Sequence, residues 1–227
     1  MKKKRVLVLT SGGLDSVTAL YDAALQHEVC LALSFDYGSK HNHRELPYAE
    51  LHSHKLGVEH KVVALDFFAD SFESSLLQTG KDIPDGSYAE SNMKQTVVPF
   101  RNGIMISIAA GIAESRELDG LVIATHAGAH PLYPDCGVDF MNAMGTALKL
   151  GTYTRLELML PFITWSKDEI VKRGFELNIN LSETWSCYKG GEYHCGECGT
   201  CIERKSAFQE AGLKDPTVYL TEMEIRN

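Results

Sequence analysis

Several absences narrow what this 227-residue chain can be. It has no low-complexity tract and no periodic glycine, since its 19 glycines and 7 prolines form no repeat, which excludes collagen-like and disordered classes. No apolar run is expected to be long enough to span a membrane. Hydrophobic residues make up 44% and charged residues 23%, so the composition favours one globular α/β domain with a small appended lobe.

Positive charge is also scarce. The 22 lysines and arginines are outnumbered by 30 aspartates and glutamates, which gives a formal net charge of −8. A protein that grips folded nucleic acid is expected to have a broad positive field, so this balance argues against a large RNA substrate. Residues 1–5, of which Lys2 to Arg5 are basic, imitate the charged start of a signal peptide, but the apolar run 6–9 is too short for export. We therefore expect a cytoplasmic protein with small-molecule substrates and no nucleic-acid or membrane partner.

Cysteine is sparse but unevenly placed. Four of the six cysteines lie in one segment with the spacing Cys187-x7-Cys195-x2-Cys198-x2-Cys201. Disulfides are rare in a reducing compartment, so this clustering indicates a metal site. Four thiolates match tetrahedral Zn²⁺ with no open position, which implies a structural metal, and a [4Fe–4S] cluster with the same ligands is the alternative. Cys30 lies in a strand pattern and is expected in the core.

Strand and helix patterns alternate along the chain. Short β-rich apolar runs are followed by segments whose apolar residues recur at helical spacing. Strands are expected at 5–10, 29–35, 59–65, 120–125 and 156–160, with helices at 15–26, 43–56, 102–115, 138–150 and after a capping box at Ser166 and Glu169. This alternation predicts a parallel twisted sheet with helices on both faces. Ligands in such sheets lie at the carboxyl ends of the strands.

The sequence predicts two domains. Residues 1–181 are expected to form a nucleotide-binding domain with a long, partly irregular insertion at 66–98. The insertion is expected over the active site, because loops of that length are usually functional. Residues 182–227 are expected to form a zinc-binding lobe, whose last helix at 202–211 ends at Gly212.

The first strand meets the first helix at Ser-Gly-Gly-Leu-Asp-Ser, residues 11–16. The two glycines allow a sharp turn, and the helix start offers unpaired N–H groups and the positive end of its dipole. Ser11 and Ser16 add hydroxyl donors, so the loop can hold a pyrophosphate. Asp15 would repel phosphate unless it holds Mg²⁺, and the alternative is that it caps the helix. The Walker pattern with its lysine is missing.

This hexapeptide resembles the PP-loop of the ATP pyrophosphatases, which adenylate a substrate and release pyrophosphate. The resemblance implies the adenine nucleotide alpha-hydrolase-like fold, and AMP rather than ADP as a product. Further segments are similar to one branch, the 7-cyano-7-deazaguanine synthases. These segments are Phe-Asp-Tyr-Gly (35–38) followed by Lys40 and His41, Val-Pro-Phe-Arg-Asn (98–102), Tyr-Pro-Asp-Cys (133–136), and 184–191 with the cysteines after it. The matches run from the first strand to about Pro216.

The resemblance implies a specific reaction. Members of this branch convert 7-carboxy-7-deazaguanine and ammonia to 7-cyano-7-deazaguanine, a precursor of queuosine and archaeosine. The carboxylate becomes an acyl adenylate and then an amide, and a second adenylation allows elimination to the nitrile. The resemblance therefore implies a C–N-forming ligase that uses ATP, Mg²⁺ and Zn²⁺ and releases AMP and pyrophosphate. It also implies a homodimer.

The loop chemistry and the resemblance together give the candidate site residues. The catalytic candidates are Asp15, Ser16, Arg101 and His126. The ATP-binding candidates are Thr10, Ser11, Gly12, Gly13, Leu14, Asp15, Ser16, Val17 and Lys189. The substrate-binding candidates are Tyr37, His41, Arg101, Asn102 and Asp135, and the metal ligands are Cys187, Cys195, Cys198 and Cys201.

Most of these residues also have a structural interpretation. Arg101 would neutralise a phosphate or the substrate carboxylate, because a cation at a helix start opposes the dipole, or it would form a surface salt bridge. Asp135 would accept N–H bonds from a guanine-like edge, or it is a turn aspartate. Lys189 faces the nucleotide, or it faces solvent on the segment that carries the four cysteines (residues 184–201, here called the cysteine segment). The proton-transfer candidates, which could equally be packed side chains, are His41, His43, His126 and His130.

Three other functions stay open at this point. A PP-loop tRNA thiolase or lysidine-type enzyme shares the ATP loop but usually needs a basic RNA-binding surface. A non-catalytic nucleotide sensor would bind ATP without forming AMP. A related ligase could act on another deazapurine, because members commonly carry a small or amide residue where Phe100 stands and an arginine where Gly137 stands.

Overall fold

The computed structural model describes residues 3–87, 91–126 and 133–224. Five short parallel strands form one sheet in the order β3-β2-β1-β4-β5. The strands are β1 Arg5–Leu9, β2 Glu28–Asp36, β3 His60–Ala64, β4 Gly120–Val122 and β5 Glu157–Met159. The parallel sheet predicted from the sequence is confirmed, although β4 and β5 are shorter than expected.

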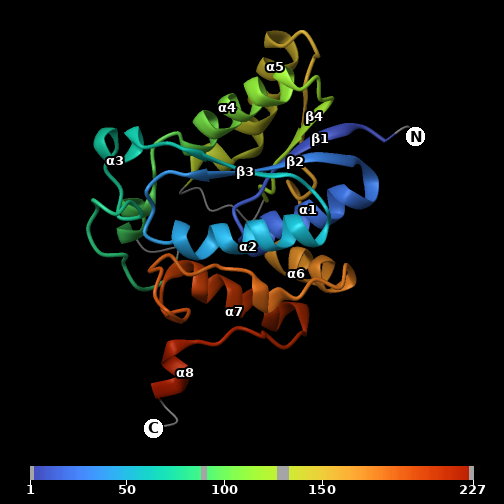
Figure 1. Ribbon diagram of the computed structural model, residues 1–227. Coiled ribbons are helices and arrows are strands. Elements are labelled where there is room, and N and C mark those ends of the chain that lie inside the picture. The colour runs from blue at the N-terminus through green and yellow to red at the C-terminus, as the bar shows by residue number, and fades with distance from the viewer. Residues whose placement is uncertain (1–2, 88–90, 127–132, 225–227) are drawn as a thin grey trace.

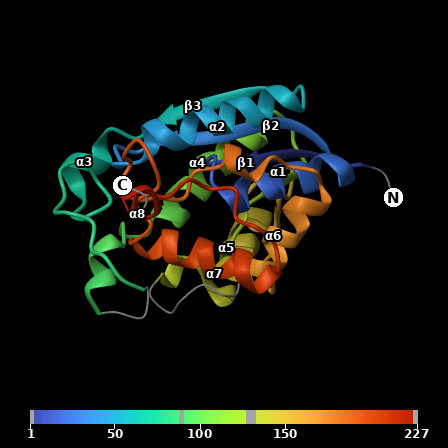
Figure 2. The same ribbon diagram turned by 90° about the horizontal axis from the view of Figure 1, so that it is seen from below.

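Helices cover both faces of the sheet, as Figures 1 and 2 show. On one face lie α4 Arg101–Ser115 and α5 Val138–Gly151. On the other lie α1 Leu14–Gln26, α2 Asn42–Lys55 and α6 Lys167–Glu176. The predicted three-layer arrangement is therefore confirmed, and so is the capping box at the start of α6.

The central strand β1 contributes to two hydrophobic cores. Successive side chains of a strand point to opposite faces, so a strand covered on both sides is apolar throughout. Val6 and Val8 pack in the core beneath α1 and α6, and Leu7 and Leu9 pack in the core beneath α4. This explains why residues 5–10 form a continuous apolar run.

The described part of the segment 66–98, residues 66–87 and 91–98, contains short helical elements as well as loops. It contains the short helix α3 Phe67–Ser71 and the 3₁₀ turn η1 Ser91–Thr96. Leu76 and Leu77 are fully buried, and bridges join Leu77 to Ser39 and Asp85 to Cys198. These contacts fix the segment to the loop after β2 and to the cysteine segment. A role as a cover over the active site stays a prediction.

The chain after residue 181 is closely integrated with the rest. It contains the 3₁₀ turn η3 Leu181–Glu183, α7 Gly199–Ala211 and α8 Leu220–Glu224, and α7 runs beside α6 (Figures 1 and 2). Phe208 of α7 packs in the same core as β1. Arg204 is buried, and its guanidinium donates to the carbonyl of Leu181 at 2.7 Å. The domain boundary at 182 stays a prediction, and both hydrophobic cores contain residues from either side of it.

Helix α4 buries the face that carries its smaller side chains. The isoleucines that recur at helical spacing along it, Ile104, Ile108 and Ile112, are only half-buried. The fully buried apolar side chains of α4 are Ile106, Ala109, Ala110 and Ala113. Small alanines let the helix approach the sheet closely, so the face with smaller side chains is the one that packs. Pro47 lies inside α2, beyond its first turn.

One segment corrects the expectation about membrane spans. Among the described residues, Met93–Ser115 is long and apolar enough to cross a membrane by length and composition. Half of its most apolar window is buried inside the protein, and a core helix passes the same test. The segment is also interrupted, because Phe100 has a left-handed backbone with φ of 53° between η1 and α4. It is therefore weak evidence for a membrane span.

Candidate active site

A cavity of about 320 Å³ opens at the carboxyl ends of β1, β2 and β4. Its walls come from the loops after these strands, from α2 and α4, and from the cysteine segment. The strand order reverses beside β1, so the cavity lies at the switch point where ligands bind in parallel sheets. Its volume suits a small-molecule site. The cavity therefore lies where the sequence predicts a ligand site, and its use as that site stays a prediction.

The cavity brings most of the predicted site residues together. Those that line it are Thr10, Ser11, Gly13, Leu14, Asp15, Ser16, Tyr37, His41, Arg101, Asn102 and His126. Among the predicted catalytic, ATP-binding and substrate-binding residues, four lie outside the lining, namely Gly12, Val17, Asp135 and Lys189. The individual roles of all these residues remain predictions.

The phosphate loop is held in shape by its own serines. The hydroxyl oxygen of Ser16 accepts the N–H groups of Ser11 at 3.0 Å and Gly12 at 3.2 Å, and it donates to the carbonyl of Gly13 at 3.0 Å. The hydroxyl oxygen of Ser11 accepts the N–H of Gly13 at 3.1 Å. These bonds fix a tight turn whose donors gather at the start of α1, which is the arrangement that binds anions.

Position 12 requires glycine for a structural reason that is separate from anion binding. Its φ is +96°, and a Cβ there would lie 2.0 Å from the carbonyl oxygen of Glu45 and 2.9 Å from the nitrogen of Ala49. Only glycine therefore lets α2 pack against the loop. The carbonyl of Gly12 also accepts the N–H of Trp185 at 3.0 Å, which ties the cysteine segment to the phosphate loop.

Asp15 lies beside a lysine that was not among the residues predicted from the sequence. The ammonium nitrogen of Lys167 lies 2.5 Å from Oδ2 of Asp15 and 3.6 Å from Oε2 of Glu203. Nε2 of His126 lies 3.9 Å from the same oxygen of Asp15. Burial by itself lowers the pKa of Lys167, but the two carboxylates outweigh it, so the pKa is raised and the ammonium stays charged.

The sequence does carry a signal for Lys167. It directly follows Ser166, the N-cap of α6, where an acidic residue is favoured and a cation opposes the helix dipole. The same argument singles out Arg101 at the start of α4. Glu203 has no comparable local signal, because it reaches the cavity from α7, far along the chain.

Tyr37 and Arg101 meet on the side of the cavity opposite the phosphate loop. Nη1 of Arg101 donates to the hydroxyl of Tyr37 at 3.0 Å, and the guanidinium lies 5.6 Å from the centre of its ring. Arg101 is therefore held inside the cavity, and the alternative of a surface salt bridge is wrong. Burial, followed by the charge of Arg101, lowers the pKa of His41 to about 3, so its imidazole is neutral at pH 7.

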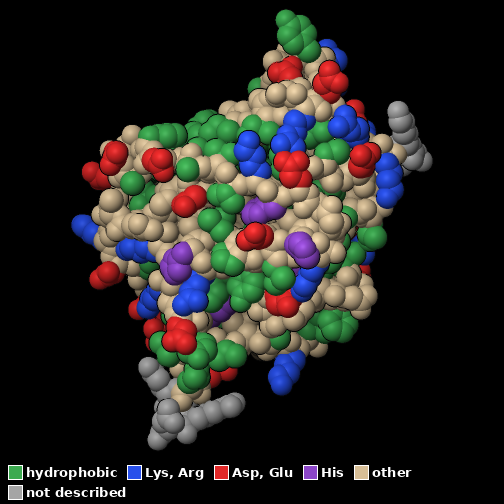
Figure 3. All heavy atoms as spheres, in the orientation of Figure 1, with side chains coloured by type: hydrophobic (Ala, Val, Ile, Leu, Met, Phe, Trp, Pro, Cys, Tyr) green, Lys and Arg blue, Asp and Glu red, His purple; other side chains and the backbone are tan. Residues whose placement is uncertain are grey.

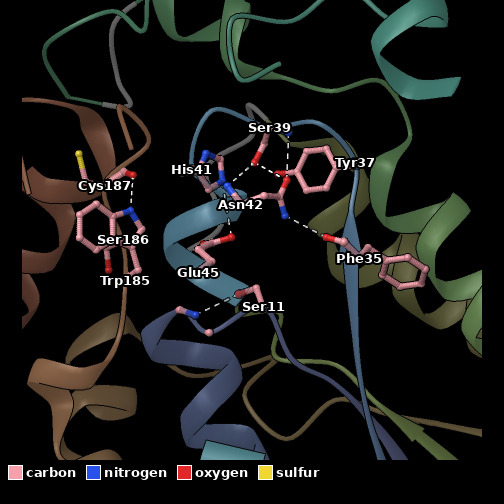
Figure 4. A network of polar contacts seen from close by, with 12 residues as sticks. Ser11, Phe35, Tyr37, Ser39, His41, Asn42, Glu45, Trp185, Ser186 and Cys187 are labelled. Carbon is pink, nitrogen blue, oxygen red and sulfur yellow. Dashed lines mark hydrogen bonds and ion pairs between the residues drawn. The ribbon is translucent and has the colours of Figure 1, made fainter. Parts of the chain in front are cut away.

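Buried Asn42 fixes the loop that carries these residues (Figure 4). Its Oδ1 accepts the N–H of Ser39 at 3.0 Å and the hydroxyl of Ser39 at 2.6 Å. Its Nδ2 donates to the carbonyl of Phe35 at 3.0 Å. These bonds join the end of β2 to the start of α2, so Tyr37 and His41 are held at the cavity by the backbone on either side of them.

Asp135 faces the start of α4 rather than the cavity. Its Oδ2 accepts the backbone N–H of Asn102 at 2.8 Å, and its carbonyl accepts the side-chain amide of Asn102 at 3.2 Å. This geometry favours the structural interpretation of Asp135. Its neighbour Cys136 does line the cavity, and burial raises the pKa of that thiol to about 11, so it is protonated at neutral pH.

Three other singled-out positions lie away from the cavity lining. The ammonium nitrogen of Lys189 lies 2.6 Å from Asp85 and 3.6 Å from Glu197, so it links the segment 66–98 to the cysteine segment. Phe100 and Gly137, where family members commonly carry other residues, are also outside the lining. Neither departure therefore changes the walls of the cavity directly.

The histidine candidates separate into three groups. His41 and His126 line the cavity, which keeps both as proton-transfer candidates. His43 is exposed on α2. His130 falls at 127–132, outside the described residues.

The four clustered cysteines come together as predicted. The sulfur atoms of Cys187, Cys195, Cys198 and Cys201 all lie within 4.8 Å of one another, and all four residues are buried. Four converging thiolates fit a tetrahedral metal with no open coordination position. Cys30, predicted in the core, is half-buried in β2 and packs against the core from its edge.

Comparison with known proteins gives a consistent result. The family model described as QueC, queuosine biosynthesis protein QueC, matches residues 5–212. The chain is 52% identical over 218 residues to the 7-cyano-7-deazaguanine synthase of Porphyromonas gingivalis, covering 96% of this chain and 98% of that protein. It is 46% identical over 220 residues to the 7-cyano-7-deazaguanine synthase of Caldicellulosiruptor bescii, covering 97% and 99%.

Solved structures with low sequence identity share the fold. The U34-tRNA thiolase NcsA from Methanococcus maripaludis, with its [4Fe-4S] cluster, has a TM-score of 0.52 at 14% identity, covering 93% of this chain and 68% of that chain. NMN synthetase from Francisella tularensis has a TM-score of 0.52 at 13% identity, covering 98% and 81%. At these identities the likeness concerns the fold alone.

Proposed function

The chain belongs to the QueC family of queuosine biosynthesis proteins, and we propose that it is an ATP-dependent 7-cyano-7-deazaguanine synthase. The proposed reaction converts 7-carboxy-7-deazaguanine and ammonia to the nitrile, with release of AMP and pyrophosphate. The observation that carries the proposal is one cavity in which a pyrophosphate-type loop faces the pair of Arg101 and Tyr37. We further propose a cytoplasmic homodimer, as the family resemblance implies.

The proposed chemistry needs two activations. A carboxylate is a poor electrophile, so one of its oxygens attacks the α-phosphorus of ATP, and pyrophosphate leaves. Ammonia adds to the carbonyl carbon of the acyl adenylate, the bond to AMP breaks, and a proton is lost to give the amide. The amide oxygen then attacks the α-phosphorus of a second ATP, and pyrophosphate leaves. AMP departs with the electrons of the C–O bond, and loss of the remaining two N–H protons gives the nitrile. Negative charge develops on pyrophosphate in both activations, where fixed donors are most effective.

The phosphate side of the cavity supplies these donors. The N–H groups at the start of α1 and the hydroxyl of Ser11 would hold the pyrophosphate, and Ser16 would keep the loop in shape through its bonds to Ser11, Gly12 and Gly13. Lys167 adds a buried positive charge beside them. Oδ1 of Asp15 is buried and has no hydrogen-bond partner among the described residues, which fits a ligand for Mg²⁺. Bound there, Mg²⁺ would neutralise charge on the triphosphate.

The opposite side supplies the substrate contacts. Arg101 points into the cavity from the start of α4 and would pair with the carboxylate of the deazapurine. Tyr37 holds the guanidinium in place through its hydroxyl. Asn102 lines the cavity, and Asp135 would act by holding Asn102 rather than by touching the substrate. The substrate carboxylate would then lie between Arg101 and the phosphate loop.

We propose that the cysteine cluster holds one structural Zn²⁺. Elemental analysis of the dialysed protein is expected to give about one zinc per chain. Cys198→Ser is expected to abolish zinc retention and to lower ATP affinity, because the N–H of Trp185 in the cysteine segment bonds to the phosphate loop. Cys30→Ser, outside the cluster, is the matched control and should keep the zinc. Iron with inorganic sulfide would contradict the zinc assignment.

The main rival is a tRNA-modifying enzyme with the same fold. On the face shown in Figure 3, lysine and arginine side chains are interspersed with aspartate and glutamate. The net charge of −8 also argues against a surface that binds tRNA. A gel shift with tRNA at moderate salt separates the two functions, and the proposed function predicts no retained complex. Tight tRNA binding would favour the rival.

A product assay tests the substrate. Purified protein is supplied with ATP, Mg²⁺ and ammonium, together with 7-carboxy-7-deazaguanine or with other carboxylated purines, and the products are identified by mass spectrometry. The amide and nitrile of 7-deazaguanine are expected. A different preferred purine would point to the related-ligase alternative, and ATP binding without AMP would point to the nucleotide sensor.

A further inference from the structure

An acidic side chain lies in a cavity that is proposed to bind two anions. Glu45 lies on α2, between the phosphate loop and the side formed by Tyr37 and His41 (Figure 4). Its Oε1 lies 3.7 Å from the position of a Cβ on Gly13, and its Oε2 lies 3.7 Å from Nε2 of His41. The side chain is 13% exposed. Glu45 therefore lies at the junction of the nucleotide and substrate sides.

The surroundings of Glu45 leave its charge poorly compensated. Within the described residues, His41 is the one side chain recorded as an ion-pair partner of this carboxyl group, and burial keeps His41 neutral. The other titratable groups that face it are Tyr37, from the loop after β2, and Arg101, from α4. Burial raises the pKa of Glu45 to about 8, and the charge of Arg101 opposes the rise. The carboxyl group is therefore more basic than an ordinary one and is mostly protonated at pH 7 without a bound cation, and a cation bound beside it would favour its ionised form.

The proposed reaction contains one reactant that suits this position. ATP and the carboxylated purine are both anions, which an ionised Glu45 would repel. Ammonia exists mainly as ammonium in neutral water, and ammonium is a cation that cannot attack a carbonyl until it loses a proton. An alkylammonium group has a pKa of about 10, so an ordinary carboxylate with a pKa of about 4 is far too weak to accept its proton. Burial raises the pKa of a carboxyl group, so the difference between its pKa and that of ammonium becomes smaller and proton transfer becomes easier.

We propose that Glu45 binds the ammonium ion and takes its proton, so that ammonia is released beside the acyl adenylate. In this step one N–H bond of ammonium breaks and one O–H bond forms on Glu45. The nitrogen lone pair then forms the C–N bond, AMP leaves with the electrons of the C–O bond, and one N–H proton of the product is lost to solvent to give the neutral amide. Glu45 returns its proton to solvent. The inference rests on the proposed function and adds the catalytic residue for its ammonia step.

The test compares Glu45→Gln with Glu50→Gln, an exposed residue of the same helix. Two rates are measured on the full-length enzyme. Substrate-dependent exchange of pyrophosphate with ATP, without ammonium, reports adenylation. Amide formation with increasing ammonium chloride gives kcat/KM for ammonium. Glu45→Gln is expected to lower kcat/KM for ammonium about 100-fold or more near pH 7. The rate of adenylation is expected to fall by less than about threefold.

The pH dependence adds a readout that a structural role would not move. As pH rises towards about 9, free ammonia forms in solution without a base, so the deficit of Glu45→Gln should shrink severalfold or more. Glu50→Gln should match the wild type throughout. Unchanged kcat/KM for ammonium in Glu45→Gln would overturn the inference, and so would an equal loss of adenylation or a raised KM for Mg²⁺ alone. No adenylation of this substrate by the wild type would instead overturn the proposed function, and the inference with it.

Discussion

Gly12→Ala is expected to destabilise the protein by about 3–5 kcal/mol and to abolish measurable ATP binding. The residue has a φ of +96°, and the added Cβ would lie 2.0 Å from the carbonyl oxygen of Glu45. The loop and α2 would have to separate, and both carry residues that line the cavity. Denaturant unfolding measures the loss of stability, and calorimetric titration measures ATP binding.

Gly57→Ala is the matched control for this prediction. Gly57 also has a positive φ, +66°, but a Cβ there would meet nothing within 4 Å. The backbone strain alone should cost about 1 kcal/mol and leave ATP binding unchanged. Similar losses of stability in Gly12→Ala and Gly57→Ala would show that backbone strain, and not the close approach of α2, explains the effect of Gly12→Ala.

Lys167→Met is expected to lower kcat/KM for ATP about 100-fold or more while the fold is retained. Methionine keeps much of the apolar stem but removes the charge that lies 2.5 Å from Asp15 and 3.6 Å from Glu203. Those carboxylates would then repel the triphosphate without compensation. Steady-state kinetics with varied ATP measures the effect, and circular dichroism checks the fold.

Lys172→Met is the control on the same helix. Lys172 is exposed and pairs with Asp168 at 2.8 Å on the outer surface of α6. Such a surface pair contributes little, so kcat/KM for ATP should stay within about twofold of the wild type. An effect of equal size at both lysines would contradict a specific role for Lys167.

The fold was predictable where local patterns and burial agree. Residues 5–10 read as a buried strand because β1 packs against helices on both faces, and the glycines after it mark the turn into α1. The stop at Gly212 was predictable for the same local reason, and its φ is +70°. The buried face of α4 was not predictable from the sequence. Whether the isoleucines or the alanines of this helix are buried depends on how closely the helix approaches the sheet.

The candidate site was predictable only in part. The phosphate loop is contiguous, so its chemistry can be read from six neighbouring residues. Lys167, Glu203 and Glu45 reach the same cavity from α6, α7 and α2, and only the tertiary structure brings them together. Asp135 shows the opposite case, because its motif suggests substrate contact, whereas its carboxylate bonds to the backbone at the start of α4.

The proposed function requires that this cavity adenylates a deazapurine carboxylate. AMP, pyrophosphate and nitrile are therefore measured together while the wild-type enzyme acts on 7-carboxy-7-deazaguanine, ATP and ammonium. We expect two AMP and two pyrophosphate for each nitrile formed, no ADP, and loss of all three products in Asp15→Ala, whose carboxylate lies at the phosphate loop beside Lys167. Formation of ADP and phosphate, or undiminished pyrophosphate release by Asp15→Ala, would contradict the proposed function.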